Sequence, residues 1–305
     1  MAVVGWGVAL PETTVTNVDL EARLDTSDRW ITERTGIRER RHGGTTGQLA
    51  AAASRQALLV AEASPASVDL LVLATSTPDQ QLPATASTVQ DILGLRCGSF
   101  DVNAACSGFV YALVAGAGMS AMGARRVLVV GADVMSRVTD QQDRGTAVLF
   151  GDGAGAVVLD AVEGPGQLLG WDLGSDGNLR HLLQADIGGY ITMVGKEVFR
   201  RAVRVMVDSS EAALARAGLT ADDVDLLVPH QANARIITAA CERLGIPVER
   251  TASVLDRTGN TSAASIPLAL GDAATSGRLS KGDIVLLVGF GAGMTWASTV
   301  LRWGP

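Results

Sequence analysis

The sequence is poor in several residue types, and each shortage excludes a class of protein. Its three cysteines, Cys97, Cys106 and Cys241, are an odd number without paired spacing, which argues against a disulfide framework and favours a reducing, cytoplasmic environment. No cysteines or histidines have the spacing of zinc ligands, so we expect no metal site. The 25 basic residues are outnumbered by 32 acidic ones, and the net charge of −7 argues against a nucleic-acid partner.

Long hydrophobic runs are also missing. The longest weakly polar stretch, 108–124, is short for a membrane span, and its many Gly and Ala residues make it only mildly hydrophobic. We therefore predict a buried core helix there and no membrane contact. The first residues lack a basic segment followed by an apolar one, so no signal peptide is expected.

The sequence does contain an internal duplication. The segment 68–72, Val-Asp-Leu-Leu-Val, recurs unchanged at 224–228. Three further pairs of segments follow in the same order: the predicted strands 127–131 and 284–288, the small-residue helices 107–122 and 262–274, and the glycine turns that enter strands at 151–159 and 291–301. Four pairs in register are much less expected by chance than one repeated pentapeptide.

The duplication predicts an α/β fold of two halves, residues 1–163 and 164–305. A chain of 305 residues is longer than one hydrophobic core usually supports. Strands and helices alternate in each half, which favours a mixed or mostly parallel sheet with helices on its faces. Two such halves side by side would share a helical layer between two sheets. The boundary is expected at the Glu-Gly-Pro-Gly segment 163–166.

Cys106 is the candidate nucleophile, because it lies between a predicted strand and the helix 107–122. A thiol at the start of a helix faces unpaired N–H groups and the positive end of the helix dipole, and both favour the reactive thiolate. The same N–H groups can stabilise an oxyanion. A buried, space-filling cysteine is the alternative, and it is our interpretation of Cys97 and Cys241.

His230 and Asn260 are the candidates to act with this thiol. His230 follows the second copy of the repeated strand, and ligands of open α/β sheets bind at such strand ends. Asn260 precedes the helix 262–274, and Ser262 is the duplicate of Cys106, so the two helix starts are expected to meet at the centre of the molecule. A structural histidine and a helix N-cap are the alternatives.

Several segments, taken in order, are typical of one family. With them the chain resembles β-ketoacyl-acyl carrier protein synthase III, of the thiolase-like superfamily, over nearly its whole length. The resemblance implies a layered αβαβα fold, a homodimer and a triad of Cys106, His230 and Asn260. Thiolases have a second Cys, and chain-elongating synthases a second His, in place of the Asn, so Asn260 implies a decarboxylating, chain-initiating enzyme. The segments are 25–37, 106–108, 143–145, 150–156, 229–233, 259–265 and 290–293.

The resemblance also implies a reaction, a decarboxylative Claisen condensation. Cys106 would take the acyl group of an acyl-CoA, and a malonyl thioester, carried first of all by acyl carrier protein and otherwise by CoA, would lose carbon dioxide and attack it. The 3-oxoacyl thioester formed would initiate fatty acid synthesis. His230 and Asn260 would stabilise the enolate oxygen, and the backbone N–H groups of Cys106 and the turn at Ala292 the second oxyanion. CoA thioesters are substrates here, and no cofactor is implied.

Other positions match the family's contacts with its substrates. Trp30, Arg34 and Arg144 match positions that hold the nucleotide end of CoA, with Trp30 and Arg144 on either side of the adenine. Arg200 and Arg235 match basic positions that would meet the acidic carrier protein. The alternatives are an edge aromatic residue for Trp30 and solvated surface charges for the arginines.

Three departures from the family pattern leave the starter acyl group open. Ala292 stands where a glycine is expected, the segment 171–191 is shorter than usual, and Leu82 stands where Phe is common at the floor of the acyl pocket. The same chemistry would also serve to prime a polyketide, to make acetoacetyl-CoA from malonyl-CoA, or to transfer acyl groups to a non-carbon acceptor.

Two interpretations from other classes are disfavoured. The glycine-rich segment 151–155 leads into a predicted strand, whereas the dinucleotide-binding fingerprint opens a helix. A non-catalytic partner subunit of a synthase usually lacks the reactive cysteine, which is present here.

Overall fold

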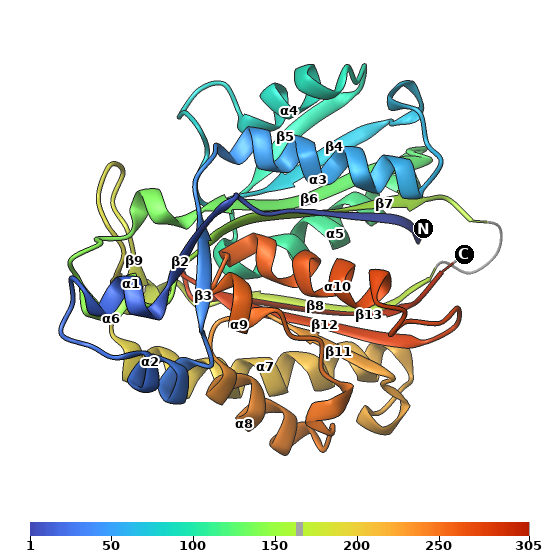
Figure 1. Ribbon diagram of the computed structural model, residues 1–305. Coiled ribbons are helices and arrows are strands. Elements are labelled where there is room, and N and C mark those ends of the chain that lie inside the picture. The colour runs from blue at the N-terminus through green and yellow to red at the C-terminus, as the bar shows by residue number, and fades with distance from the viewer. Residues whose placement is uncertain (163–166, 305) are drawn as a thin grey trace.

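The computed structural model describes residues 1–162 and 167–304, so the half boundary predicted between 163 and 164 lies outside the described residues. Two β-sheets lie one above the other, with helices between them and on both outer faces (Figure 1). From top to bottom the layers are helices, sheet, helices, sheet, helices. The predicted αβαβα fold is confirmed.

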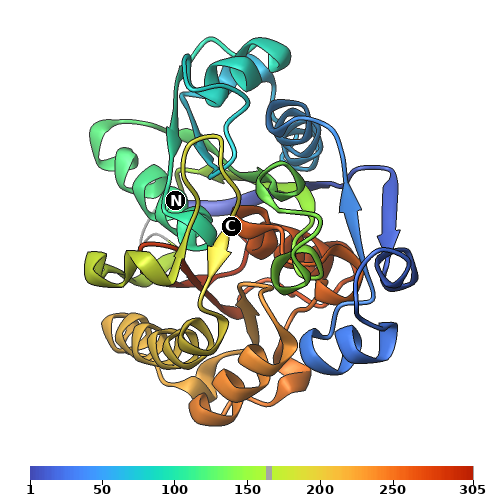
Figure 2. The same ribbon diagram turned by 90° about the vertical axis from the view of Figure 1, so that its left-hand side faces the viewer.

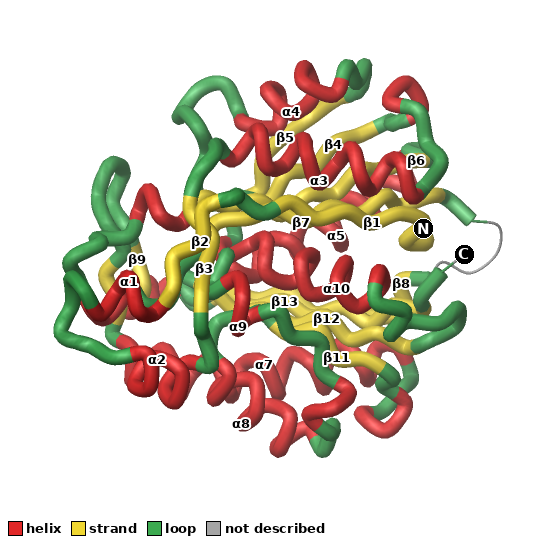
Figure 3. The backbone as a smooth tube through the Cα atoms, viewed as in Figure 1, coloured by secondary structure: helices red, strands yellow, loops and turns green. Residues whose placement is uncertain are grey.

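The first sheet has five strands in the order β1-β7-β6-β4-β5. Strand β4 is parallel to β5 and β6, whereas β7 is antiparallel to β1 and β6, so the sheet is mixed. Helices α3 and α4 cover its outer face (Figure 3). The bounds are β1 Ala2–Ala9, β4 Leu70–Ala74, β5 Gly98–Val102, β6 Arg126–Val134, β7 Asp152–Asp160, α3 Thr46–Val60 and α4 Thr85–Leu93.

The second sheet has four strands in the order β11-β12-β13-β8, and helices α7 and α8 lie below it. Strand β12 is parallel to β11 and antiparallel to β13, as β6 is parallel to β4 and antiparallel to β7. The counterpart of β5 is reduced to a bridge between Leu227 and Thr251. The bounds are β8 Leu168–Ser175, β11 Leu226–Pro229, β12 Ile284–Gly291, β13 Thr295–Arg302, α7 Gly195–Ala217 and α8 Ala234–Leu244.

Two helices, α5 (Gly108–Gly118) and α10 (Ser265–Thr275), form the central layer. Each is preceded by a short 3-10 turn, η2 (Ala105–Ser107) before α5 and η8 (Ser262–Ala264) before α10. By length and composition alone the helical stretch 105–122 could cross a membrane, and 44% of it is buried inside the protein. It packs between the two sheets, as a core helix does.

The central strands are apolar without interruption because both faces of each sheet are covered. Successive side chains of a strand point to opposite faces, so each strand supplies two cores. Val72 of β4 and Val129 of β6 lie in the core between the sheets, whereas Leu71 and Leu128 lie in the core under α3 and α4. A third core fills the space between the second sheet and its outer helices.

The remaining elements gather at one end of the sandwich (Figure 2). The segment that contains η5, β9 and β10 lies beside the segment that leads to α6, and Ile191 N donates a hydrogen bond of 2.8 Å to Val138 O. The bounds are β2 Thr13–Thr16, β3 Glu39–His42, β9 Leu183–Gln184, β10 Thr192–Met193, α1 Asn17–Glu21, α2 Asp28–Thr35, α6 Arg144–Ala147, α9 Leu255–Thr258 and η5 Gly177–Leu182.

Glycines let the two 3-10 turns lie directly on the strands. A Cβ atom on Gly131 of β6 would stand 2.3 Å from Ala263 O of η8, which no real side chain tolerates. In the same way, a Cβ atom on Gly289 of β12 would stand 3.1 Å from the Cα atom of Ser107 in η2. Each turn is thus seated on the strand of its duplicate half, and both turns are held at the centre of the molecule.

Candidate active site

The two duplicated helix starts meet at the centre, as the sequence predicts. Cys106 of η2 and its duplicate Ser262 of η8 face each other, and the Cys106 thiol donates to Ser262 Oγ across 3.5 Å. Two residues in these turns, Ala105 (φ 49°) and Ser262 (φ 52°), adopt the left-handed conformation that non-glycine residues avoid. Backbone strain of this kind is concentrated at functional sites, where the surrounding structure has to maintain it.

His230 follows β11 and is buried to 1% exposure. Its Nδ1 atom lies 2.7 Å from Ser265 Oγ at the start of α10, and its ring stands edge-on to Phe290 with the centroids 5.3 Å apart. The neighbouring Gln231 and Asn233 have other tasks. Gln231 Nε2 donates a hydrogen bond to Pro229 O, and Gln231 Oε1 accepts one from Val254 N. Asn233 caps α8, because its Oδ1 accepts a hydrogen bond from Arg235 N.

Asn260 is held by its backbone and by one side-chain oxygen. Its N–H donates to Leu149 O at 2.8 Å, and its carbonyl accepts from Gly151 N at 3.0 Å. Its Oδ1 atom accepts from Ser262 N at 2.9 Å, which fixes the plane of the carboxamide. Because Oδ1 is engaged within the turn, the Nδ2 amide group is left to donate to a ligand.

Two cavities meet at the thiol. The first, about 180 Å³ in volume, is lined by Cys106, His230 and Asn260 together with Phe199 and Asn233. The second, about 190 Å³, shares Cys106, Phe150 and Leu183 with the first. The second is lined by Ser76, Asn103, Met135, Ile191, Ser262 and Ala292, among others. The three predicted triad residues thus share one cavity, and the thiol is common to both cavities.

The end of β12 lies against the backbone of Cys106. A Cβ atom on Gly291 would stand 2.5 Å from Cys106 N, so a side chain at this position would cover that amide group. The next residue, Ala292, lines the second cavity. Positive φ in this turn falls on Gly293 (φ 131°) and not on Ala292, so alanine is accommodated there without strain.

Burial opposes the thiolate that the helix start favours. Cys106 is only 7% exposed, and burial raises the pKa of its thiol to about 12. Burial also lowers the pKa of His230 to about 3, so the imidazole is neutral. The free energy lost when the charged thiolate and imidazolium are removed from water is larger than the stabilisation that the start of a helix gives to a thiolate. Thiol and imidazole are therefore both uncharged before substrate binds.

The residues predicted to hold CoA come together near the first cavity. The Arg144 guanidinium lies 4.4 Å from the centre of the Trp30 ring and donates to Asp25 O at 2.8 Å. A flat base between them needs about twice the 3.5–4.0 Å carbon contact distance, so Arg144 has to move for adenine to enter. Arg34 is exposed, and its carbonyl accepts a hydrogen bond from Asn233 Nδ2 at 3.0 Å.

The two predicted docking arginines are exposed near the same cavity. Arg200 lies on α7 and pairs with Glu197 at 2.6 Å. Arg235 lies on α8 with its guanidinium 5.6 Å from the centre of the Phe199 ring, which lines the first cavity. Both charges therefore flank residues of the cavity wall.

Leu82, the predicted pocket residue, lies outside both cavities of the single chain. It is 85% exposed on the loop before α4 and lines neither cavity. The short segment 171–191 nevertheless contributes to both cavities through Leu183, and to the second through Gln184, Ala185 and Ile191.

Sequence reasoning missed the partners of the predicted residues. Ser265, which contacts the imidazole, was inside a recognised segment but received no role. Phe290 belongs to the family segment 290–293, and its contact with His230 is not predicted by the sequence. Asp133 was missed although it is the single charge inside an otherwise apolar strand interior, and that interruption was a usable signal. Among the described residues, no group of three or more His, Cys, Asp and Glu side chains is placed to bind a metal ion.

The fold and this site define a class, the thiolase-like condensing enzymes. Comparison with known proteins supports the same class. The sequence profile for 3-oxoacyl-[acyl-carrier-protein] synthase III matches residues 100–177, and the profile for the C-terminal part of that enzyme matches residues 214–303. The chain is 50% identical to the β-ketoacyl-[acyl-carrier-protein] synthase III of Sinorhizobium medicae, and the match covers 98% of each chain. It is equally 50% identical to that of Roseiflexus castenholzii, with 99% of this chain and 98% of the relative covered.

Solved structures agree. The 3-oxoacyl-[acyl-carrier-protein] synthase III of Aquifex aeolicus superposes with a TM-score of 0.97 at 45% identity, covering 99% of both chains. The priming β-ketosynthase of the R1128 polyketide pathway superposes with a TM-score of 0.95 at 38% identity, covering 99% of this chain and 96% of the other. The chain belongs to the β-ketoacyl-acyl carrier protein synthase III family of acyltransferases.

The raised thiol pKa predicts how the resting enzyme reacts with iodoacetamide. Because only the thiolate is alkylated, modification of Cys106 is expected to be slow near pH 7 and to keep rising up to about pH 10 without a plateau. The rate is measured by mass spectrometry of the Cys106 peptide, with the Cys97 and Cys241 peptides quantified separately. A plateau reached below about pH 8 would mean that the resting enzyme stabilises a thiolate after all.

Proposed function

We propose that this enzyme condenses an acyl-CoA starter with malonyl-acyl carrier protein, and that Cys106, His230 and Asn260 carry out the reaction. The observation that carries the proposal is the common cavity of these three side chains, with a second cavity beyond the thiol. The first cavity is the entrance for the two thioesters, and the second receives the acyl chain. The product is a 3-oxoacyl thioester, and the reaction initiates fatty acid synthesis.

The first half-reaction transfers the acyl group to Cys106. Since the thiol is protonated at rest, its proton must leave as sulfur attacks, and His230 Nε2 is the base in the same cavity. His230 Nδ1–H then donates to the Ser265 hydroxyl. The bond between sulfur and acyl carbon forms, the bond between acyl carbon and CoA sulfur breaks, and the proton passes to the CoA thiolate.

The second half-reaction forms the carbon–carbon bond. The malonyl group loses carbon dioxide, and its electron pair makes an enolate, which Asn260 Nδ2 and His230 Nε2–H stabilise. For this step the Ser265 hydroxyl donates to Nδ1, so one hydroxyl serves both tautomers. The enolate carbon attacks the acyl group on Cys106, whose oxyanion accepts from the backbone at Cys106 and the Ala292 turn. The Cys106 sulfur leaves and takes up a proton.

Substrate binding involves both sides of the first cavity. Trp30, Arg34 and Arg144 hold the nucleotide of CoA by stacking and by charge. Arg200 and Arg235 meet the acidic carrier protein when it delivers the malonyl group. The side chains that form the second cavity are mostly small or aliphatic, which suits a short acyl starter.

A homodimer formed along β5 completes the proposal. Strand β5 is an edge strand, and edge strands offer unpaired N–H and C=O groups to a second chain. Phe100 on this edge is 38% exposed, and Leu82 on the neighbouring loop is 85% exposed. Pairing of two copies would cover both side chains and bring Leu82 toward the partner subunit.

Polyketide priming is the second candidate function. The similarity to the R1128 priming β-ketosynthase favours it, because the fold and the condensation chemistry are shared. The starter group separates the two, so a panel of acyl-CoAs offered with malonyl-acyl carrier protein and with malonyl-CoA discriminates between them.

Variants of the triad are expected to separate the two half-reactions. Cys106→Ala should form no acyl-enzyme in mass spectrometry with a labelled acyl-CoA. Asn260→Ala should still form it at the normal rate, whereas His230→Ala should form it more slowly, because it also loses the base of the first half-reaction. The condensation rates of both variants should fall by about 100-fold or more, because each loses an oxyanion donor. Asn178→Ala removes an exposed carboxamide outside both cavities and serves as the control. An Asn260→Ala enzyme that condensed at the normal rate would exclude the amide from the mechanism.

Separate variants test the two substrate contacts. Arg144→Ala is expected to raise the KM for the acyl-CoA about 10-fold and to leave the KM for malonyl-acyl carrier protein unchanged. Arg235→Ala should do the reverse. Steady-state kinetics with each substrate varied in turn measures both values. If both variants changed the same KM, the two binding roles would have been assigned wrongly.

The dimer is tested by sedimentation equilibrium. The expected mass is twice the 31.5 kDa of the chain. Phe100→Asp places a charge on the edge strand and should yield a monomer, whereas Leu59→Asp, at a position that is 79% exposed on α3, should remain dimeric. A wild-type enzyme that sediments as a monomer would contradict the proposed assembly.

A further inference from the structure

Asp133 is a buried carboxylate next to the site. It lies near the end of β6, is 0% exposed and lines neither cavity. Burial of a charged group is costly unless hydrogen bonds surround it. The contacts of Asp133 therefore indicate what it does.

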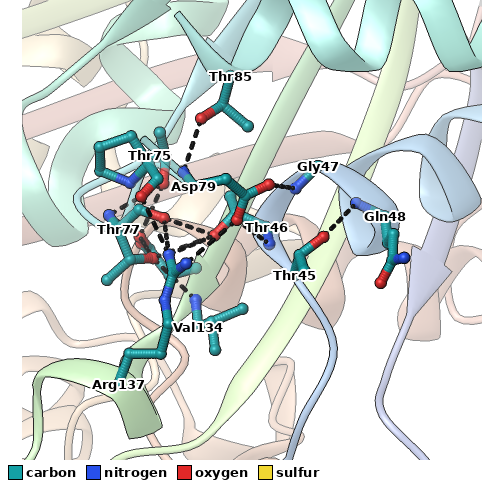
Figure 4. Close-up of polar contacts among 12 residues, drawn as sticks. Thr45, Thr46, Gly47, Gln48, Thr75, Thr77, Asp79, Thr85, Val134 and Arg137 are labelled. Atoms are coloured by element: carbon teal, nitrogen blue, oxygen red, sulfur yellow. Dashed lines mark hydrogen bonds and ion pairs between the residues drawn. The ribbon is translucent and has the colours of Figure 1, made fainter. Parts of the chain in front are cut away.

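Both carboxylate oxygens accept hydrogen bonds, but from different parts of the chain. Oδ1 accepts from the loop after β4, through Ser76 N at 2.8 Å, Thr77 N at 3.0 Å, Thr77 Oγ1 at 2.8 Å and Thr75 Oγ1 at 3.0 Å. Oδ2 accepts from Ala263 N of η8 at 2.9 Å. Thr75, Thr77 and Val134 belong to the wider polar network in Figure 4, in which Thr77 Oγ1 also accepts from Val134 N at 2.8 Å.

The duplication shows what is special about this position. Val127 pairs with Leu70 and Val285 pairs with the equivalent Leu226, so the two strands align one residue further along than the predicted pairing of 127–131 with 284–288. Gly131 is therefore equivalent to Gly289, and Asp133 to Gly291. At Gly291 the absence of a side chain leaves the backbone of Cys106 uncovered. At Asp133 a carboxylate occupies the corresponding place and binds Ala263 N. One helix start is left open to bind an oxyanion, and its duplicate is closed by the Asp133 carboxyl group.

We propose that Asp133 is a positioning residue for the Asn260 amide. It fixes η8 through Ala263 N, the adjacent Ser262 N fixes Asn260 Oδ1, and Asn260 Nδ2 is thereby aimed into the first cavity. Through Oδ1 it also holds the loop with Ser76, which lines the second cavity. The inference rests on the proposed role of Asn260 and adds the residue through which the fold maintains it.

A carboxamide cannot replace this carboxylate. All three backbone contacts are N–H donors, which need an acceptor opposite them. An asparagine at this position would present its NH₂ group either to Ala263 N or to the amides of residues 76 and 77, and one of them would lose its partner. Burial raises the pKa of Asp133, whereas the surrounding donors, Ala263 N first among them, oppose that rise.

The test is Asp133→Asn, assayed for each half-reaction. Formation of the acyl-enzyme is expected to stay within about 3-fold of wild type, while kcat for condensation falls on the order of 10-fold to 100-fold, because only the second half-reaction uses the Asn260 amide. Asp69→Asn is the matched control. It removes a carboxylate that accepts from two backbone amides, Arg125 N and Arg126 N, at the opposite end of β6. Equal losses in both half-reactions, or the same loss in the control, would overturn the proposal.

A double-mutant cycle distinguishes positioning from general destabilisation. If Asp133 acts through Asn260, Asp133→Asn should slow condensation by less than about 3-fold when introduced into Asn260→Ala. Independent effects would multiply and refute the proposal. If Asp133→Asn does not fold, Thr75→Val takes its place, because it removes one donor to Oδ1 at nearly unchanged volume. It is expected to show the same selectivity at roughly 3-fold to 10-fold.

Wild type and Asn260→Ala are measured in parallel, so that two failures can be told apart. A wild-type enzyme without condensation, or an unaffected Asn260→Ala, would refute the proposed function itself. Loss in Asn260→Ala together with normal condensation in Asp133→Asn would refute only the positioning role. Circular dichroism and thermal melting confirm that each variant is folded before it is assayed.

Discussion

The close contact of η2 with η8 is the constraint on which the rest of the structure depends. Glycines at 131 and 289 let each turn lie against the strand of the other half, closer than a side chain would allow at 131 and with little room for one at 289. The contact places Cys106 opposite Ser262 at 3.5 Å and brings Asn260 into the same cavity as the thiol. An enzyme whose reacting groups come from distant parts of the chain needs such a rigid centre.

The two halves share one architecture, but the starts of their central helices have different chemistry. Each sheet contains an equivalent parallel strand pair, β4-β6 in the first and β11-β12 in the second, and both central helices are preceded by a 3-10 turn. In one half the helix start carries a thiol with an uncovered backbone. In the other the equivalent amides are occupied by Asn260 Oδ1 and Asp133 Oδ2. The second helix start therefore serves as a rigid support for a donor and not as a second anion site.

Electrostatics in the site are governed by the exclusion of water. Burial raises the pKa of the thiol and lowers that of the imidazole, so neither group is charged before substrate enters. The neutral imidazole can carry its proton on Nδ1 or on Nε2, because the Ser265 hydroxyl can either accept or donate the hydrogen bond at Nδ1. His230 can therefore accept a proton in one step and donate a hydrogen bond in the next. An ionised pair would have lost that freedom.

The sequence alone determined the duplication, the α/β class and the residues that gather around the thiol, because repeats and apolar strand patterns are local and leave a direct record. The family resemblance added the turn at Ala292 as an expected neighbour of Cys106. Tertiary structure decided the rest. The protonation of Cys106 depends on burial by residues from both halves, and the sequence signal of a helix start pointed the other way. Leu82 lies outside both cavities because it is on an exposed loop. Asp133 and Ser265 gained their partners only through packing over long sequence separations, which no local pattern encodes.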